Sequence, residues 1–436
     1  MEKLLEMAAT TCDQAEVYAV EYTNNTVSFE NAQLHDIDSK ILSGVSLRVI
    51  KDGKLGFAYI RNLHDPEALV QHALASLEGG IEVGYDFPLT TDLPQLDTYD
   101  PALEALSNTH LVQECARVCD TLASNTSGEI AMIAFAHLGA IRILNTSGTD
   151  LSLRHSLYGA YSQIIYPGSG SGIVRQVREK TFAPMPDKLV NEMIDLYTRS
   201  SKSVEPQGGK MKVIFMPNSA HTLTWRIASG MSAKNIYEHI SPIADRLDER
   251  IFDERLTISD DPLNDSYPGA RAFDDEGVPC RYFPLVEDGV LKNFYTDLNY
   301  AHKLNMPPTG HGYRTAMWGG DVIALHPAPS LMYLTIQPGD QAFSDLVHSL
   351  DRGIIVEGAL GAHSGNIPNG DYSIGINPGF YVENGEIVGR VKDAMVAGNI
   401  YETLQHVLAV ENVVHPCGAG RIPALLCDAV SVATKS

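Results

Sequence analysis

A glycine-rich stretch at residues 353–399 gathers the polar side chains best placed for binding or chemistry. A short apolar strand at 354–356 leads into glycines interleaved with a histidine, a serine, asparagines and an aspartate. Glycine lets the backbone bend tightly and lets another main chain approach closely. We expect either a loop at the mouth of a sheet that binds an extended peptide, or a glycine-rich connection without a ligand. The expected peptide-binding residues are His363, Ser364, Gly365, Asn366, Gly370, Asp371 and Tyr372.

Histidines and a cysteine in the last third of the chain offer a second kind of chemistry, a metal site. Imidazole and thiolate groups are the ligands that zinc prefers. His311, His363, His415 and Cys417 could converge on one mouth, which would make the chain a stand-alone metallohydrolase. None of their spacings is that of a recognisable helical metal motif, so the sequence favours no metal in this chain.

Composition and charge exclude several classes of function. The 436 residues carry a formal net charge of −22, which argues against broad binding to nucleic acid. No apolar run of about 18 residues predicts a membrane span. The first residues lack the apolar core of a signal peptide, and six cysteines in so long a chain do not indicate a disulfide scaffold. We expect a cytoplasmic protein that contacts neither nucleic acid nor membrane.

Hydrophobic periodicity predicts the elements that must hold the glycine-rich stretch. Asp65 followed by Pro66 predicts a helix start, because aspartate caps a helix and proline fits its first position. Alternating apolar residues predict strands at 16–21, 26–30, 34–39, 43–50, 54–60, 129–138, 140–145 and 151–166. Helical spacing predicts further helices at 102–122, 187–200 and 217–230.

The order of these elements predicts an α+β protein, with antiparallel sheets in an N-terminal α/β region and a β-rich C-terminal domain. Irregular sequence at 88–101 and the proline and glycine residues at 205–209 suggest boundaries. We expect an α+β subdomain at 1–100, a second at 101–207 and the β-rich domain at 208–436.

Several spaced blocks, in order along essentially the whole chain, resemble the TldD/PmbA family. The glycine-rich stretch supplies Gly365-Asn366, Gly370-Asp371-Tyr372-Ser373 and the run from Gly379 to Glu386. Upstream, Phe273 to Pro279 is similar to a second block of the family. The family was called "modulator of DNA gyrase" and is better described by a two-subunit cytosolic metalloprotease, TldD with TldE (PmbA).

The resemblance places the family's metal motif, His-Glu-x-x-x-His, on the helix at 217–230. Here the matching residues begin with His221, while Thr222 replaces the general base and Arg226 replaces the second ligand. A hydroxyl cannot take a proton from zinc-bound water, and a guanidinium repels a cation. Cys417 matches the family's C-terminal cysteine ligand. We hypothesise that Arg226 pairs with a carboxylate such as Asp371 or Glu357.

The resemblance therefore implies a non-catalytic TldE/PmbA-like subunit, with no cofactor of its own and with vestigial positions His221, Thr222, Arg226 and Cys417. Its partner would be a TldD-type catalytic paralogue that holds zinc, and its substrate an extended peptide. When alone, the chain could form a homodimer. Two alternatives stay open: the stand-alone metallohydrolase, and a regulatory protein that binds gyrase or a toxin–antitoxin system.

Overall fold

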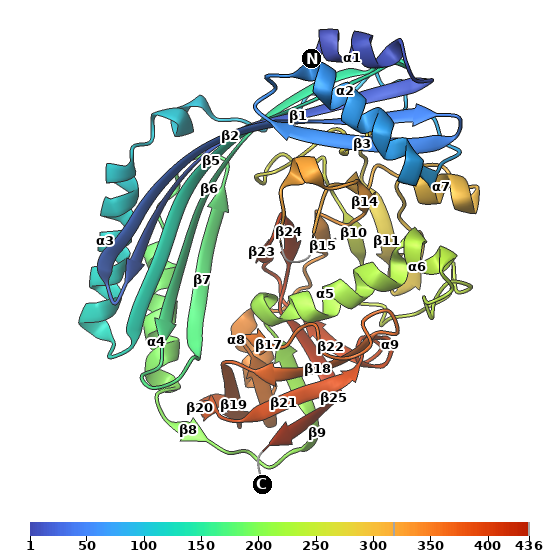
Figure 1. Ribbon diagram of the computed structural model, residues 1–436. Coiled ribbons are helices and arrows are strands. Elements are labelled where there is room, and N and C mark those ends of the chain that lie inside the picture. Colours follow the sequence, from blue (N-terminus) through green and yellow to red (C-terminus); the bar gives the residue numbers. More distant parts are fainter. Residues whose placement is uncertain (317–318, 435–436) are drawn as a thin grey trace.

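Two sheet-centred parts lie side by side in the computed structural model, which describes residues 1–316 and 319–434 (Figure 1). The predicted fold class is confirmed: the chain is α+β, with an antiparallel N-terminal sheet and a β-rich C-terminal domain. Among the described residues, no helix is long and apolar enough to cross a bilayer.

The N-terminal part is built on one seven-stranded antiparallel sheet of order β4-β3-β2-β1-β5-β6-β7. Its strands are β1 (Gln14–Glu30), β2 (Gln33–Lys51), β3 (Lys54–Arg61), β4 (Ile81–Glu82), β5 (Glu129–Asn145), β6 (Asp150–Ile165) and β7 (Gly172–Glu179). Several predicted strands merge into longer ones. Asn24, a poor strand former, stays in β1 because it lies between Lys40 of β2 and His137 of β5.

Four helices cover one face of this sheet and bury its core. The helices of this part are α1 (Glu2–Ala9), α2 (Pro66–Ala75), α3 (Asn108–Asn125) and α4 (Asp187–Arg199), with 3-10 turns at Ser76–Gly79 and Pro101–Ala105. Asp65 caps α2 as predicted, since its carboxylate accepts a hydrogen bond from the Ala68 amide at 2.9 Å. Leu111 and Val118 of α3 pack with Met132 of β5, so the opposite face of the sheet is left toward the C-terminal part.

The boundary expected near residue 100 does not separate two sheets. β1 pairs along its length with β5, so residues on both sides of that boundary share one ladder of hydrogen bonds. The segment at 88–100 is therefore a connection within the N-terminal part. The composition of a short stretch of sequence cannot reveal this pairing, because the paired residues of β1 and β5 are more than a hundred residues apart.

The C-terminal part contains a ten-stranded sheet and a six-stranded sheet with α5 (Pro217–Met231) lying against them. The ten-stranded sheet holds β17 (Ala359–Leu360), β18 (Asp371–Ile376), β21 (Ala394–Asn399), β25 (Leu425–Thr434), β9 (Gly209–Phe215), β16 (Arg352–Val356), β19 (Gly379–Glu383), β20 (Glu386–Val391), β8 (Ser203–Val204) and β22 (Val407–Val410). The six-stranded sheet holds β12 (Val290–Leu291), β11 (Phe283–Glu287), β10 (Ile258–Asp260), β15 (Leu334–Ile336), β24 (Gly420–Ile422) and β23 (His415–Cys417). The remaining elements are α6 (Ala233–Tyr237), α7 (Leu298–Leu304), α8 (Phe343–His348), α9 (Ile400–Thr403), the pair β13 (Gly312–Tyr313) and β14 (Ala328–Pro329), and a 3-10 turn at Val322–Ala324.

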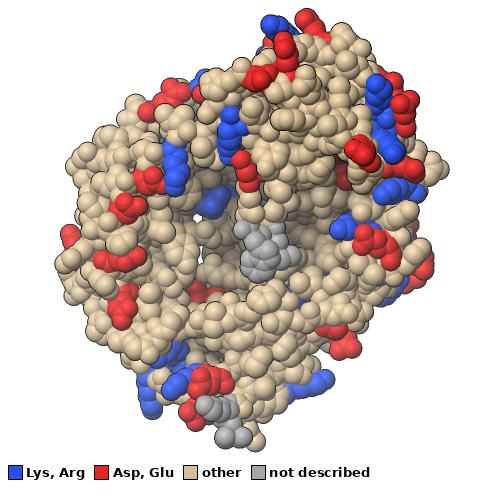
Figure 2. Space-filling view, in the orientation of Figure 1, with Lys and Arg blue, Asp and Glu red and all other residues tan. Residues whose placement is uncertain are grey.

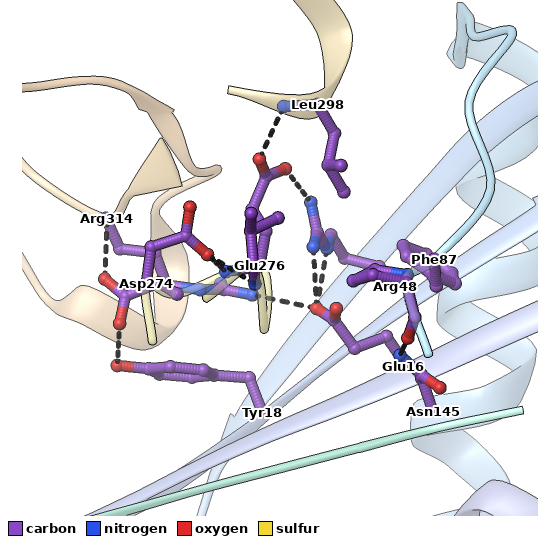
Figure 3. A network of polar contacts seen from close by, with 12 residues as sticks. Glu16, Tyr18, Arg48, Phe87, Asn145, Asp274, Glu276, Leu298 and Arg314 are labelled. Atoms are coloured by element: carbon purple, nitrogen blue, oxygen red, sulfur yellow. Dashed lines mark hydrogen bonds and ion pairs between the residues drawn. The ribbon is translucent and has the colours of Figure 1, made fainter. Parts of the chain in front are cut away.

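A buried network of charges fastens the two parts together (Figure 3). Arg48 of β2 donates to Glu16 of β1 and, through Nη1, to Glu276 Oε1 at 2.9 Å. The other oxygen of Glu276 accepts the Leu298 amide at the start of α7, at 2.8 Å. Because one guanidinium pairs with carboxylates from both parts, this network fixes the N-terminal sheet over the C-terminal part.

Candidate functional site

The cleft between the two parts is the candidate site. Figure 2 shows the surface hollowed there, and a cavity of about 360 Å³ lies where the β6–β7 hairpin meets the C-terminal part. Tyr161, Gln163 and Val174 line it from the N-terminal sheet. Asn218, Glu357, Leu360 and Asn377 line it from the other side.

Contacts between β7 and the C-terminal part join the two sides of the cleft. Arg175 of β7 pairs with Glu357, which is 2 % exposed, at 2.5 Å between Nη1 and Oε1. Gln176 of β7 donates to the Pro416 carbonyl at 3.0 Å. Because these contacts join the N-terminal sheet to the C-terminal part, they fix the width of the cleft beside β7.

An edge strand opens onto this cleft. β17 is the terminal strand of the ten-stranded sheet and, among the residues that the structure describes, pairs with β18 alone, through Ala359 opposite Ile376 and Leu360 opposite Gly375. Leu360 is 58 % exposed and lines the cavity. An unpaired strand edge offers main-chain donors and acceptors to an extended peptide, and a neighbouring apolar side chain can contact the peptide's side chains.

The glycine-rich loop follows β17 directly. The Asp371 amide donates to the Asn366 carbonyl at 3.0 Å, which closes the loop. Gly365 has φ +104°, and a Cβ there would lie 2.5 Å from the Asp371 carbonyl oxygen, so the turn requires glycine. His363, Gly365 and Asn366 are exposed, as a peptide-binding loop needs.

The other residues that were predicted to bind peptide are buried or half-buried, or form hydrogen bonds within the protein. Tyr372 is 2 % exposed, and its hydroxyl pairs with Thr403 at 2.8 Å. Asn399 donates to the Asp371 carboxylate at 2.8 Å, and Gly370 is buried. Ser364 is half-buried, and its carbonyl is held by the helix described next. A contact of Tyr372 with a peptide could therefore involve only its main chain.

Arg226 of α5 ties this loop to the helix. Its guanidinium donates to four carbonyl oxygens, those of Asp371 at 2.6 Å, Ser364 at 2.7 Å, Ala362 at 3.0 Å and its own-helix neighbour Thr222 at 2.8 Å. The hypothesis that Arg226 pairs with a carboxylate is wrong. The two expected partners are otherwise engaged, Glu357 by Arg175 and the Asp371 carboxylate by Asn399.

The remaining positions that match the metal motif do not fit a zinc ion. His221 Nδ1 lies 2.7 Å from the Asn218 carbonyl oxygen, and burial lowers the pKa of this imidazole. Burial raises the pKa of the Cys417 thiol, which lies on β23, a strand in contact with α5. The Thr222 hydroxyl is buried without a hydrogen-bond partner. One imidazole and one thiol beside a guanidinium lack the third ligand and the base that zinc hydrolysis needs.

The alternative metal ligands do not come together either. His311 is 1 % exposed, with Nδ1 2.8 Å from the Thr309 hydroxyl and its ring against Phe283. His415 Nε2 lies 3.0 Å from a Glu411 carboxylate oxygen that also accepts the Ala424 amide. Within residues 1–316 and 319–434, no group of three or more histidine, cysteine, aspartate or glutamate side chains is arranged to hold a metal.

Sequence reasoning missed the N-terminal wall of the cleft. Tyr161 and Gln163 alternate with buried residues on β6, which predicts a strand but not what its exposed face meets. Arg175 gave no signal, because its partner Glu357 is distant in sequence.

The fold and cleft define a two-part α+β protein with the edge strand of a sheet beside the cleft. A family model described as the PmbA/TldA metallopeptidase C-terminal domain matches residues 208–434, and one described as domain 1 matches residues 15–77. The chain belongs to the PmbA/TldD metallopeptidase family, as the sequence blocks predicted.

Relatives and solved structures agree with this assignment. The chain is 24% identical over 450 residues to Metalloprotease PmbA of Escherichia coli O157:H7, covering 97% of this chain and 93% of that protein. It is 26% identical to an uncharacterised protein of Methanocaldococcus jannaschii, covering 95% of each. The structure of TldE from Thermococcus kodakarensis superimposes with a TM-score of 0.91 at 22% identity, covering 99% of each chain, and so has the same fold.

Proposed function

We propose that this chain is the non-catalytic, TldE/PmbA-like subunit of a cytoplasmic TldD/TldE-type metalloprotease. The observation that carries the proposal is Arg226. Its buried guanidinium occupies the helix position of a metal-binding histidine and makes three of its four hydrogen bonds to carbonyl oxygens of the loop, at Ala362, Ser364 and Asp371. Zinc and the general base would then belong to a TldD-type partner. A protein named zinc metalloprotease TldD homolog from Saccharolobus solfataricus is among the relatives, at 27% identity over 226 residues.

The same subunit would help to hold the peptide. An unfolded peptide that adds as a strand beside β17 would gain main-chain hydrogen bonds that do not depend on its sequence. His363 and Asn366 on the exposed loop, with Leu360 beside them, would contact its side chains. This arrangement suits a subunit that shapes a chamber for extended peptides.

The stand-alone metallohydrolase remains the second candidate, because several relatives are named metalloproteases. Its metal donors would have to come from His311, His363, His415 and Cys417. Metal content of the untagged protein separates the two candidates. Stoichiometric zinc in the isolated chain would favour the second one, whereas a metal-free chain would favour the companion subunit.

Peptide cleavage by separated and mixed subunits tests the proposal. We expect no cleavage of an unstructured peptide by this chain alone, and chelator-sensitive cleavage once the His-Glu-x-x-x-His paralogue from the same organism is added. The paralogue alone and a mixture with an unrelated acidic protein are the controls. Chelator-sensitive cleavage by this chain alone would overturn the proposal.

A further inference from the structure

Half of strand β2 has a free edge. β3 pairs with β2 only from Gly44 to Lys51, whereas β1 pairs with β2 along its whole length. In the part of the chain that the structure describes, no strand pairs with the outer side of residues 33–43. This edge lies on the far side of the sheet from β7 and the cleft (Figure 1).

The hydrogen bonds of β2 show which main-chain groups point outward. The Ile50 carbonyl accepts from the Asp13 amide on the β1 side, and the Ser43 carbonyl accepts from Arg61 of β3 on the outer side. The register with β1 runs unbroken from Asp36 to Ile50, so inward and outward groups alternate over this span. The N–H and C=O groups of Ile37, Ser39 and Ile41 therefore point away from the sheet.

The side chains on this edge are apolar on one face and charged on the other. Ile37 is 46 % exposed and Ile41 is 75 % exposed, which are high values for isoleucine in a sheet. Asp38 and Lys40 alternate with them and, in the single chain, pair with each other. A strand edge with unpaired main-chain groups and exposed apolar side chains is a template for pairing with a strand of another chain.

We propose that a second copy of this chain covers this edge, pairing antiparallel about a two-fold axis at Ser39. In that register Ile37 lies opposite Ile41 of the partner subunit, and Asp38 lies opposite Lys40 of the partner subunit. Each contact occurs twice, as an interface between identical surfaces requires. The outward groups of the two Ser39 residues then face each other as a hydrogen-bonded pair.

Charge selects this register among its neighbours. An axis at Ile37 sets Asp36 opposite a second aspartate, and an axis at Asp38 or Lys40 sets that residue opposite itself. Like charges directly opposite one another destabilise a pair of strands, and opposite charges stabilise it. An axis at Ile41 would draw in Gly44, which already pairs with β3. The proposal rests on the N-terminal sheet alone and does not depend on the function proposed above.

Disulfide trapping in the full chain tests the register. Antiparallel residues in a hydrogen-bonded pair have Cα atoms about 5.5 Å apart, which a disulfide can span. We expect Ser39→Cys to form a cross-linked dimer under mild oxidation. Ser43→Cys, on the same edge but far from its own copy in this register, should stay monomeric, as should the wild type with its native cysteines. A monomeric Ser39→Cys, equal cross-linking of Ser43→Cys, or cross-linking only to a different polypeptide would overturn the proposal.

Charge reversal supplies an independent test. Asp38→Lys places two lysines opposite one another at two points, so we expect about tenfold weaker dimerisation by sedimentation. The double variant Asp38→Lys with Lys40→Asp restores opposite charges and should recover the wild-type dimer. Loss of dimer in both variants would contradict the proposed pairing.

Discussion

Arg226 carries a buried positive charge that is balanced by carbonyl dipoles instead of by a carboxylate. Burial lowers the pKa of its guanidinium, although an arginine in a protein keeps its charge. Three of its four acceptors lie in or beside the glycine-rich loop, at Ala362, Ser364 and Asp371. A metal ion at this position would have drawn its ligands from side chains, whereas the guanidinium draws its partners from the main chain and so fixes the loop's path.

Replacement of this guanidinium should loosen the loop. We expect Arg226→Met to lower the free energy of unfolding by about 3 kcal/mol, because buried carbonyls lose charge-assisted hydrogen bonds. Amides of residues 361–371 should also exchange faster with deuterium. Arg199→Met, which removes an exposed pair with Asp195, is the matched control and should change stability by less than about 1 kcal/mol. Equal effects of the two variants would contradict the role given to Arg226.

At the scale of elements, the two-residue edge strand β17 and the loop after it form the part of the site that is exposed to the cleft. β17 ends at Leu360, and the chain turns back at Gly365 to enter β18 at Asp371. The turn leaves no space for a side chain, since the Asp371 carbonyl oxygen that Arg226 binds also lies against Gly365. Loop shape and helix contact therefore depend on the same main-chain atom.

Addition of one methyl group at Gly365 tests whether the turn requires glycine or can relax to hold a side chain. We expect Gly365→Ala to destabilise the C-terminal part by about 2 kcal/mol, because a positive φ and a close carbonyl both oppose a Cβ. Gly170→Ala, in the β6–β7 turn with nothing within 4 Å of the added atom, serves as the control. Thermal unfolding midpoints of both variants test this expectation, and the midpoint should fall for Gly365→Ala alone. An unchanged midpoint for Gly365→Ala would show that the turn can relax.

The sequence predicted most elements but few of their partners. Asp65 capped its helix as expected, because such a signal lies within a few residues. The glycine-rich loop was also found in advance. The carbonyl partners of Arg226 and the pairing of Arg175 with Glu357 were not, because no local pattern shows which main-chain atoms a fold will leave facing a given side chain.

At the scale of the whole molecule, carboxylates are packed together where the two parts meet. Burial, and then the charge of Glu276, raises the pKa of Asp297 to about 7. Burial also raises the pKa of Asp274 well above its usual range. Arg48 offsets this negative charge from the N-terminal side (Figure 3). The junction therefore responds to pH near neutrality.

Asp297→Asn should stabilise the protein at alkaline pH. The folded state holds this proton up to about pH 7, whereas the unfolded chain releases it near pH 4, so the wild type loses stability as pH rises through this window. Asparagine cannot ionise and can still accept the Tyr300 amide that Asp297 binds at 2.8 Å. Relative to the wild type, we expect the variant to gain about 3 kcal/mol of stability between pH 4.5 and pH 8.

Unfolding midpoints measured from pH 4.5 to 8 test this expectation. Asp65→Asn, which changes an exposed helix cap of the same kind on α2, is the matched control. A parallel displacement of the two curves for Asp297→Asn and wild type, with no divergence toward high pH, would contradict it.

The charge network at Arg48 also affects whether the N-terminal and C-terminal parts can fold as separate fragments. A cut near residue 207 would leave the buried Glu276 carboxylate in one fragment without Arg48, while Arg48 in the other fragment would keep only Glu16 as its carboxylate partner. An ionised group without its counterion is among the costliest things a protein interior can contain. We therefore expect each fragment to be unstable alone, and the two fragments to reassemble when they are co-expressed.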